Sequence, residues 1–303
     1  MRFAKLFPPG TADSKPETCT IADANVALDS IAFSTIPQQD IPDITFIDGG
    51  SAVLFSTPTR AFGIIKICEV RTKGLKRESV KLHQYLVSVT RDGAFTIRSE
   101  PLAGADPAVS ACLDGEIESP DATPEQLIDT LRALAERAIV PASLTVHDGS
   151  LRTTDPLLQR CAPSKDTFAL AKSSAIITSR SRPLGVALLQ RAPAGTWAAQ
   201  LCDNTIKTWA VRLHQRAAHV FLLEGTREEP ALLSALAAWS QDITFPGYPY
   251  PLVLADQLGR VTNNERDAWR LILRSDAQAA EVIADESRAQ DAHAQLEHIL
   301  YGR

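Results

Sequence analysis

The chain has 303 residues, 45% of them hydrophobic and 22% charged, and a net charge of −5 from 36 acidic and 31 basic residues. This composition is typical of a globular protein and argues against a surface that coats nucleic acid throughout, although it is compatible with a local basic groove. No segment approaches the roughly 20 apolar residues of a membrane-spanning helix, and the N-terminus lacks a secretory-signal pattern. The five cysteines are scattered, which argues against a disulfide framework and a thiolate zinc site. We therefore expect a soluble, cytoplasmic protein.

The first part of the chain predicts a lead-in followed by strands. Residues 1–40 contain several prolines and little periodicity, so we expect an extended segment with one short helix. Segments rich in Val, Ile, Phe and Thr then predict an antiparallel meander. These segments are Ile44–Asp48, Ser51–Thr57, Ala61–Arg71, Leu82–Thr90 and Ala94–Arg98. The turn Arg91-Asp92-Gly93 predicts the last hairpin, and residues 100–122 predict a loop.

A capped helix and a short strand follow. Thr123-Pro124-Glu125-Gln126 combines a hydroxyl N-cap, a proline at the first helical position and a capping-box glutamine. Leucines and alanine from Leu127 to Ala138 then recur at helical spacing, and Pro141 ends the helix. Ser143–His147 predicts a strand that leads directly into Asp148.

The second part of the chain predicts both strands and helices. Strands are predicted at Phe168–Ala171, Thr196–Leu201, Lys207–Leu213 and His219–Leu223, and helices at Pro230–Trp239, Leu252–Leu258 and from Asn264 onward. We expect a lead-in at 1–40, a main domain at 41–262 and a helical segment of the same domain at 263–303.

Two aspartates each end a predicted strand and precede a glycine that permits a sharp turn, in Asp48-Gly49 and Asp148-Gly149. Glu136 lies on the helix between them, where its offset from the apolar positions also fits a solvated side chain. Carboxylates suit Mg²⁺ or Mn²⁺, and two such ions about 4 Å apart activate a water and stabilise a leaving oxygen. A single Asp-Gly also fits a plain turn, but the repeated pattern indicates a metal site.

Several motifs in matching order resemble the NurA nuclease family over residues 44–262. They are Asp48-Gly49, Glu136, Asp148-Gly149-Ser150-Leu151, Ala171-Lys172-Ser173-Ser174 and the segment from Gly247-Tyr248-Pro249-Tyr250-Pro251 to Asp256. The resemblance implies an α/β, RNase H-like mixed sheet flanked by helices, here with a helical C-terminal extension. It also implies a Mn²⁺- or Mg²⁺-dependent DNA nuclease with 5′ to 3′ exonuclease and single-strand endonuclease activities. Such proteins act on DNA ends as homodimers docked on a hexameric HerA-type ATPase, in DNA repair or phage defence.

Carried over by position, the resemblance makes Asp48, Glu136 and Asp148 metal ligands. Asp256 stands as a fourth ligand where many relatives have histidine; an aspartate ligates a hard metal but does not act as a histidine acid or base near neutral pH. Lys172 is expected to contact a phosphate or the developing charge, which completes the expected catalytic set.

Other residues are candidates for DNA contact. Arg180 and Arg182 follow Lys172 closely, and Tyr248 and Tyr250 are able to stack on bases, although tyrosines beside prolines also serve as turn and packing residues. The basic run from Arg71 to Lys81 fits either DNA contact or a solvated hairpin tip.

Three functions remain open at this point. The leading hypothesis is a two-metal nuclease that works with a translocase. The second is a non-catalytic adaptor or regulator of a DNA translocase complex, and the third is a phosphatase for small substrates. His147 precedes Asp148 and by strand alternation points to the opposite face, so it is not expected to be a ligand.

Overall fold

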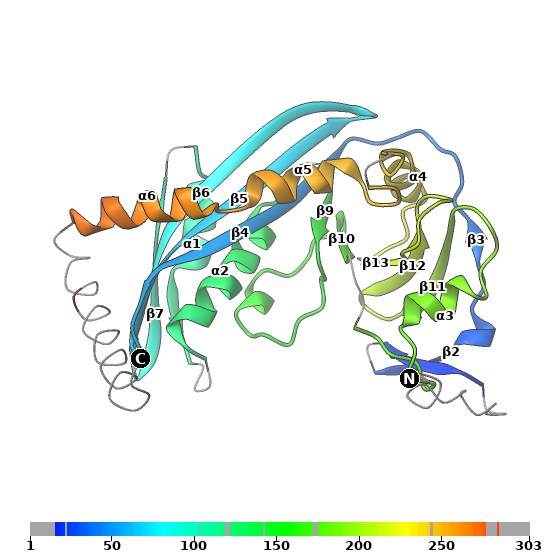
Figure 1. Cartoon of the computed structure of the whole chain (residues 1–303), viewed down its shortest axis with the longest axis horizontal. Helices are drawn as coiled ribbons and strands as arrows, with labels where there is room; N and C mark the ends of the chain where they lie inside the picture. Colours follow the sequence, from blue (N-terminus) through cyan, green and yellow to red (C-terminus); the bar gives the residue numbers. More distant parts are fainter. Residues whose placement is uncertain are drawn as a thin grey trace, which may run out of the picture.

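The computed structural model describes residues 16–21, 23–102, 104–118, 122–141, 143–171, 175–242, 245–276 and 284. Its main feature is an eleven-stranded sheet with the order β3-β11-β12-β13-β10-β9-β4-β5-β6-β7-β8 (Figure 1). The strands are β3 (Ser34–Thr35), β4 (Ile44–Ser56), β5 (Arg60–Lys73), β6 (Lys76–Asp92), β7 (Ala94–Pro101), β8 (Gly115–Ile117), β9 (Leu144–Asp148), β10 (Thr167–Ala171), β11 (Trp197–Asp203), β12 (Lys207–Arg212) and β13 (Phe221–Gly225). A separate antiparallel pair consists of β1 (Thr18–Ile21) and β2 (Ala24–Ala27).

Five neighbouring strands form the core of the sheet. β4, β5 and β6 pair antiparallel, as the predicted meander requires, whereas β9 runs parallel to β4 and β10 runs parallel to β9. β13, β12, β11 and β3 extend this core with antiparallel strands. The mixed sheet with flanking helices confirms the predicted α/β, RNase H-like fold.

Helices pack against both faces of the sheet. They are α1 (Pro107–Leu113), α2 (Pro124–Ala138), α3 (Leu184–Leu189), α4 (Pro230–Trp239), α5 (Tyr250–Gly259) and α6 (Asn263–Arg274). Ile47 of β4 packs in one apolar cluster with Leu131 of α2. Its neighbour Phe46 points the other way and packs with Leu232 of α4 and Leu252 of α5. In Figure 1, α5 and α6 cross in front of β4 and β5, so α2 and α5 approach the same strand from opposite sides.

Most predicted elements form, and their local chemistry explains why. Thr123 and Gln126 make the predicted capping box at the start of α2, and Gly93 adopts φ +73° in the predicted hairpin turn. The segment predicted as a loop at 100–122 instead contains α1 and β8, and α3 has no predicted counterpart. The predicted helix from Asn264 onward is described up to Arg274 as α6; residues 277–283 and 285–303 lie outside the described residues. None of the helices described is long and apolar enough to cross a membrane.

The predicted turn after Asp48 is wrong, because β4 continues without interruption to Ser56. Gly49 and Gly50 stay paired with β5, and their missing side chains admit neighbours on the two faces. A Cβ on Gly49 would lie 2.9 Å from Oε1 of Glu136, and a Cβ on Gly50 would lie 2.8 Å from the carbonyl oxygen of Gly259. The two glycines therefore provide room for close contact with both helix layers, which is a common use of glycine within a strand.

Replacing Gly50 by alanine should push the end of α5 away from β4. The added Cβ meets backbone atoms of Gly259 and Arg260, which cannot rotate away. We expect Gly50→Ala to lower the free energy of unfolding by about 1–3 kcal/mol, the usual cost of overpacking. Chemical denaturation measures this change, and Ser51→Ala on the same strand is the control. Equal stability of the two variants would contradict the close approach.

Glu17, the residue directly before β1, is a buried charge held by several partners. Glu17 is fully buried, and its carboxylate accepts hydrogen bonds from Arg182, Arg191 and Thr178. Hydrogen bonding to Arg182 is the largest effect that lowers the pKa of Glu17, to about 2, and Thr178 and Arg191 add to it against the opposing effect of burial. Part of the predicted lead-in is thus tied firmly to residues 178–191.

Because the pKa of Glu17 is lower in the folded state, its stabilising contribution is present above pH 4.5 and is lost as the pH falls towards 2. We expect Glu17→Gln to cost about 3 kcal/mol near pH 7, with the difference from wild type shrinking below pH 4.5. Chemical denaturation of both proteins at a series of pH values measures this difference in the free energy of unfolding. Asp29→Asn, which removes an exposed partner of Arg191, should cost less than about 1 kcal/mol. A pH-independent difference between Glu17→Gln and wild type would contradict the assignment.

Candidate metal centre

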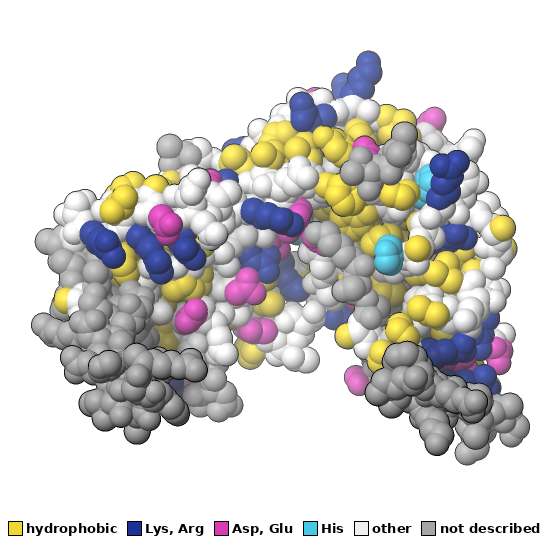
Figure 2. Space-filling model, in the orientation of Figure 1, with side chains coloured by type: hydrophobic (Ala, Val, Ile, Leu, Met, Phe, Trp, Pro, Cys, Tyr) yellow, Lys and Arg dark blue, Asp and Glu magenta, His cyan; other side chains and the backbone are white. Residues whose placement is uncertain are grey.

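Three aspartates from distant parts of the chain converge on one point. Asp48 of β4, Asp148 at the end of β9 and Asp256 of α5 each place a carboxylate oxygen within 4.8 Å of the other two. Within the described part of the chain no other group of three such side chains meets this criterion. Figure 2 shows an indentation at the lower centre of the molecule, and both basic and acidic side chains lie around it. The sequence predicted all three residues.

Strand alternation explains how these side chains meet. Asp48 lies two residues after Phe46, and Asp148 two residues after Val146, and both apolar residues belong to the cluster under α4 and α5. Parallel pairing of β4 and β9 brings the two aspartates to the same level, with Ile47 opposite His147. α5 then supplies Asp256 from above this face.

Glu136 approaches from the other face. It is buried on α2, although its spacing from the apolar positions also fitted a solvated side chain. Its carboxylate is paired with Arg132 one turn earlier, and it occupies the space that Gly49 leaves open. Glu136 falls outside the group of three, yet it lies close enough to Asp48 for their charges to interact.

Crowding of acids changes their protonation. Burial, followed by the charges of Asp148 and Glu136, raises the pKa of Asp48 to about 8, and a hydrogen bond with Asp148 adds to this effect. Burial raises the pKa of Glu136 to about 7 in spite of the opposing charge of Arg132. The metal-free centre therefore holds protons near neutral pH, and a divalent cation would displace them because it binds the ionised carboxylates.

Tyr248 is part of this centre, in a position unlike the predicted stacking position. Its ring is buried against Phe221, with centroids 5.2 Å apart, and its hydroxyl donates a 3.0 Å hydrogen bond to Oδ1 of Asp148. Burial and the charge of Asp148 raise the pKa of Tyr248, so the hydroxyl stays protonated. Gly247 before it adopts φ +95°, with Ala217 so close that a Cβ would not fit.

The other predicted residues lie apart from the three aspartates. Tyr250 is exposed at the start of α5, Arg180 is exposed in a turn, and Arg182 holds Glu17. Lys172 lies outside the described residues. His147 is buried on the α2 side as strand alternation predicts, and burial followed by the charge of Arg137 lowers its pKa to about 4.

The sequence did not reveal two charged residues that hold the chain after Asp148. Glu224 of β13 accepts a 2.7 Å hydrogen bond from the Leu151 amide, and Arg137 of α2 donates to the carbonyl oxygens of Ser150 and Leu151. The sequence did contain one indication of Glu224, because this glutamate directly follows the predicted strand His219–Leu223. Asp256 has a further partner in Arg260, at 2.6 Å one turn along α5.

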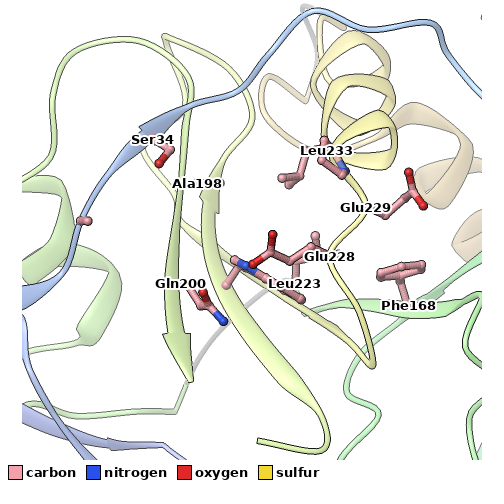
Figure 3. Close-up of a pocket in the computed structure, with 11 residues that line it drawn as sticks. Ser34, Phe168, Ala198, Gln200, Leu223, Glu228, Glu229 and Leu233 are labelled. Atoms are coloured by element: carbon pink, nitrogen blue, oxygen red, sulfur yellow. The ribbon is translucent and has the colours of Figure 1, made fainter. Parts of the chain in front are cut away.

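A separate cavity of ≈ 270 Å³ lies between β11–β13 and the start of α4. In Figure 3, Gln200, Leu223 and Glu228 lie between Ser34 on one side and Leu233 of α4 on the other. None of its lining residues belongs to the aspartate cluster, so the cavity is not part of the metal centre.

Comparisons with known proteins agree with this architecture. Residues 173–261 match the model of the NurA domain. The NurA nuclease from Sulfolobus solfataricus is 14% identical, with 82% of this chain and 88% of that chain covered and a TM-score of 0.52. A second NurA structure is 10% identical (82% and 92% covered, TM-score 0.45), and the catalytic domain of human Endonuclease V is 15% identical (77% and 84% covered, TM-score 0.33). A comparison with curated protein sequences finds no match.

The first of these structures establishes a shared fold, and the matched segment contains Glu224, Tyr248 and Asp256. Asp48, Glu136 and Asp148 precede that segment; the two aspartates belong to the group of three, whereas Glu136 lies on α2 outside it. Residues 173–261 thus match the NurA domain model, and the chain has a fold like that of a NurA nuclease, as its resemblance to the NurA family predicts.

Proposed function

We propose that this protein is a metal-dependent deoxyribonuclease that hydrolyses phosphodiester bonds. The convergence of Asp48, Asp148 and Asp256 within 4.8 Å is the observation that carries the proposal. An all-oxygen donor set selects hard cations such as Mg²⁺ and Mn²⁺ over thiophilic metals. The fold, shared with a NurA nuclease, supports nuclease activity. The resemblance of the sequence motifs to that family is the ground for proposing a DNA substrate, with 5′ to 3′ exonuclease and single-strand endonuclease activities.

The three aspartates would hold the ions, and Glu136 would complete the ligand set from the α2 side. A pair of bound divalent ions supplies Lewis acidity, which activates the attacking water and stabilises the leaving oxygen. Tyr248 holds Asp148 through its hydroxyl, and Arg132 limits the repulsion between Glu136 and the aspartates. Lys172 would contact a phosphate of the substrate.

The family resemblance supports the wider setting. We propose that the protein acts in the cytoplasm as a homodimer with a HerA-type hexameric ATPase, on DNA ends in repair or phage defence. Arg180 and Tyr250 are exposed and accessible to DNA, whereas Tyr248 is buried and Arg182 is engaged with Glu17.

Replacing Asp48 or Asp148 by asparagine should abolish manganese-dependent DNA degradation. Asparagine keeps the shape of the side chain but removes the charge that binds the ion. We therefore expect cleavage activity to fall by about 100-fold or more, a larger effect than is usual for residues that only hydrogen-bond to a metal ligand. End-labelled single- and double-stranded DNA, incubated with Mn²⁺ or EDTA, measures the activity. Asp166→Asn, which alters an exposed aspartate paired with Arg227, is the control.

Full activity of Asp48→Asn or Asp148→Asn would refute the proposed centre. Wild-type protein that cleaves no DNA, alone or with its motor, would favour the adaptor. Turnover of nitrophenyl phosphate without DNA cleavage would favour the phosphatase.

Stabilisation by Mn²⁺ should increase with pH. The pKa of Asp48 is higher in the folded state, so the folded metal-free protein binds more protons than the unfolded chain and loses stability as the pH rises from about 4 to 8. Mn²⁺ competes with those protons and should stabilise the protein more at pH 8 than at pH 5.5. At 100 times its dissociation constant, the ion adds about 2.7 kcal/mol, which is a rise of several degrees in Tm.

Calorimetry of EDTA-treated protein, with and without Mn²⁺ at both pH values, measures this dependence. Asp48→Asn should be more stable than wild type without metal at pH 8 and should lose most of the Mn²⁺-induced rise in Tm. An equal rise at both pH values would contradict the exchange of protons for the ion.

A further inference from the structure

The chain immediately after Asp148 has to be held in place for that aspartate to keep its position. Gly149 adopts φ +105°, and a Cβ on this residue would have no neighbouring atom within 4 Å, so packing does not restrain the turn at this point. One backbone hydrogen bond, from the Gly149 amide to the carbonyl oxygen of Leu170, ties it to β10 at 3.2 Å. Other contacts must therefore fix residues 150–152.

Glu224 provides these contacts on one side. Its side chain is 7% exposed, and its Oε2 accepts hydrogen bonds from the hydroxyl of Ser150 at 2.7 Å, the amide of Leu151 at 2.7 Å and the amide of Arg152 at 3.4 Å. Its Oε1 lies 3.4 Å from Nε of Arg152. A buried carboxylate that accepts three hydrogen bonds and is paired with an arginine is satisfied without a metal ion, and Glu224 is not a member of the aspartate cluster.

Arg137 provides contacts on the other side. One guanidinium nitrogen donates to the carbonyl oxygens of Ser150 and Leu151, both at 3.1 Å. The peptide groups after Asp148 thus have amides directed to an anion and carbonyls directed to a cation. Arg137 is also the neighbour of Glu136 on α2, so this contact links the helix that carries Glu136 to the strand end that carries Asp148.

We propose that Glu224 and Arg137 are positioning residues, which clamp residues 150–152 and thereby fix Asp148 relative to Glu136 and Asp48. The inference deepens the proposed function and rests on it where ion binding is concerned. The clamp itself is a property of the metal-free fold, because every contact that forms it is made by protein atoms.

Glu224→Gln removes the charge of the side chain and keeps its volume. A glutamine oxygen accepts about two hydrogen bonds and its amide group only donates, so it cannot satisfy the three donors of Ser150, Leu151 and Arg152 that Glu224 accepts from. The neutral side chain keeps the packing of β13, which favours folding of the variant. Arg137→Met tests the opposite half of the clamp with a side chain of similar reach.

A matched control is available in Glu69, a second buried glutamate of the same sheet. It accepts from Arg71 at 2.5 Å and lies 3.3 Å from Nε2 of His83, and it belongs to neither the clamp nor the aspartate cluster. Glu69→Gln therefore reports the general effect of neutralising a buried glutamate on stability.

Two measurements on the full chain test the proposal, both well below the Tm of each variant. Calorimetric titration with Mn²⁺ should show about tenfold weaker binding for Glu224→Gln and Arg137→Met, the usual effect of removing support behind a ligand, and unchanged binding for Glu69→Gln. Hydrogen exchange in metal-free buffer should show at least about tenfold faster exchange of the Leu151 and Arg152 amides in Glu224→Gln only.

The results separate the two proposals. Wild-type Mn²⁺ affinity and unchanged exchange in Glu224→Gln would overturn the clamp, even if the variant melts at a lower temperature. Absence of Mn²⁺ binding by the wild-type protein would overturn the metal centre, and slow exchange at residues 151 and 152 that depends on Glu224 would still establish the clamp.

Discussion

Mutual repulsion of carboxylates is the constraint on which this structure depends. Two unit charges 4.8 Å apart repel by about 3 kcal/mol at an effective dielectric constant of 20, and three aspartates make three such pairs. A chain tolerates this arrangement only where stronger contacts fix the backbone on which the acids stand. Here Asp48 is in the middle of a strand paired on both sides, Asp148 ends a strand between two parallel neighbours, and Asp256 is on a helix pressed against β4.

The surrounding residues reduce the repulsion in different ways. Asp48 is buried and retains a proton near neutral pH, Asp148 accepts from the Tyr248 hydroxyl, and Asp256 is paired with Arg260. Two of these are reversible, since the proton on Asp48 can leave and the exposed arginine can move away. A divalent cation would replace both with direct charge neutralisation, which fits a centre that changes protonation when it binds metal.

Sequence patterns predicted much of the fold and pointed to Asp48 and Asp148, because these follow from local rules. Alternation and turn chemistry fix β4 to β7, and the capping box fixes the start of α2. The family motifs led to Asp256. The turn after Asp48 failed as a prediction because Gly49-Gly50 looks like a turn locally, whereas its role is to admit Glu136 and Gly259 across the sheet. Glu224 was missed for the same reason, since its partners are 72–74 residues away and no local pattern shows them.

The resemblance to the NurA family implies a histidine where this chain has Asp256, and an aspartate gives a different balance of charge at the centre. A histidine near its usual pKa would be partly cationic or neutral, whereas an aspartate adds a negative charge beside Asp48 and Asp148. That charge favours a hard divalent cation and disfavours the metal-free state, and Arg260 offsets it while the ion is absent. Because Arg260 is 68% exposed, its guanidinium can return to water when an ion binds, with little loss of hydration. An aspartate at position 256 is thus compatible with a metal centre.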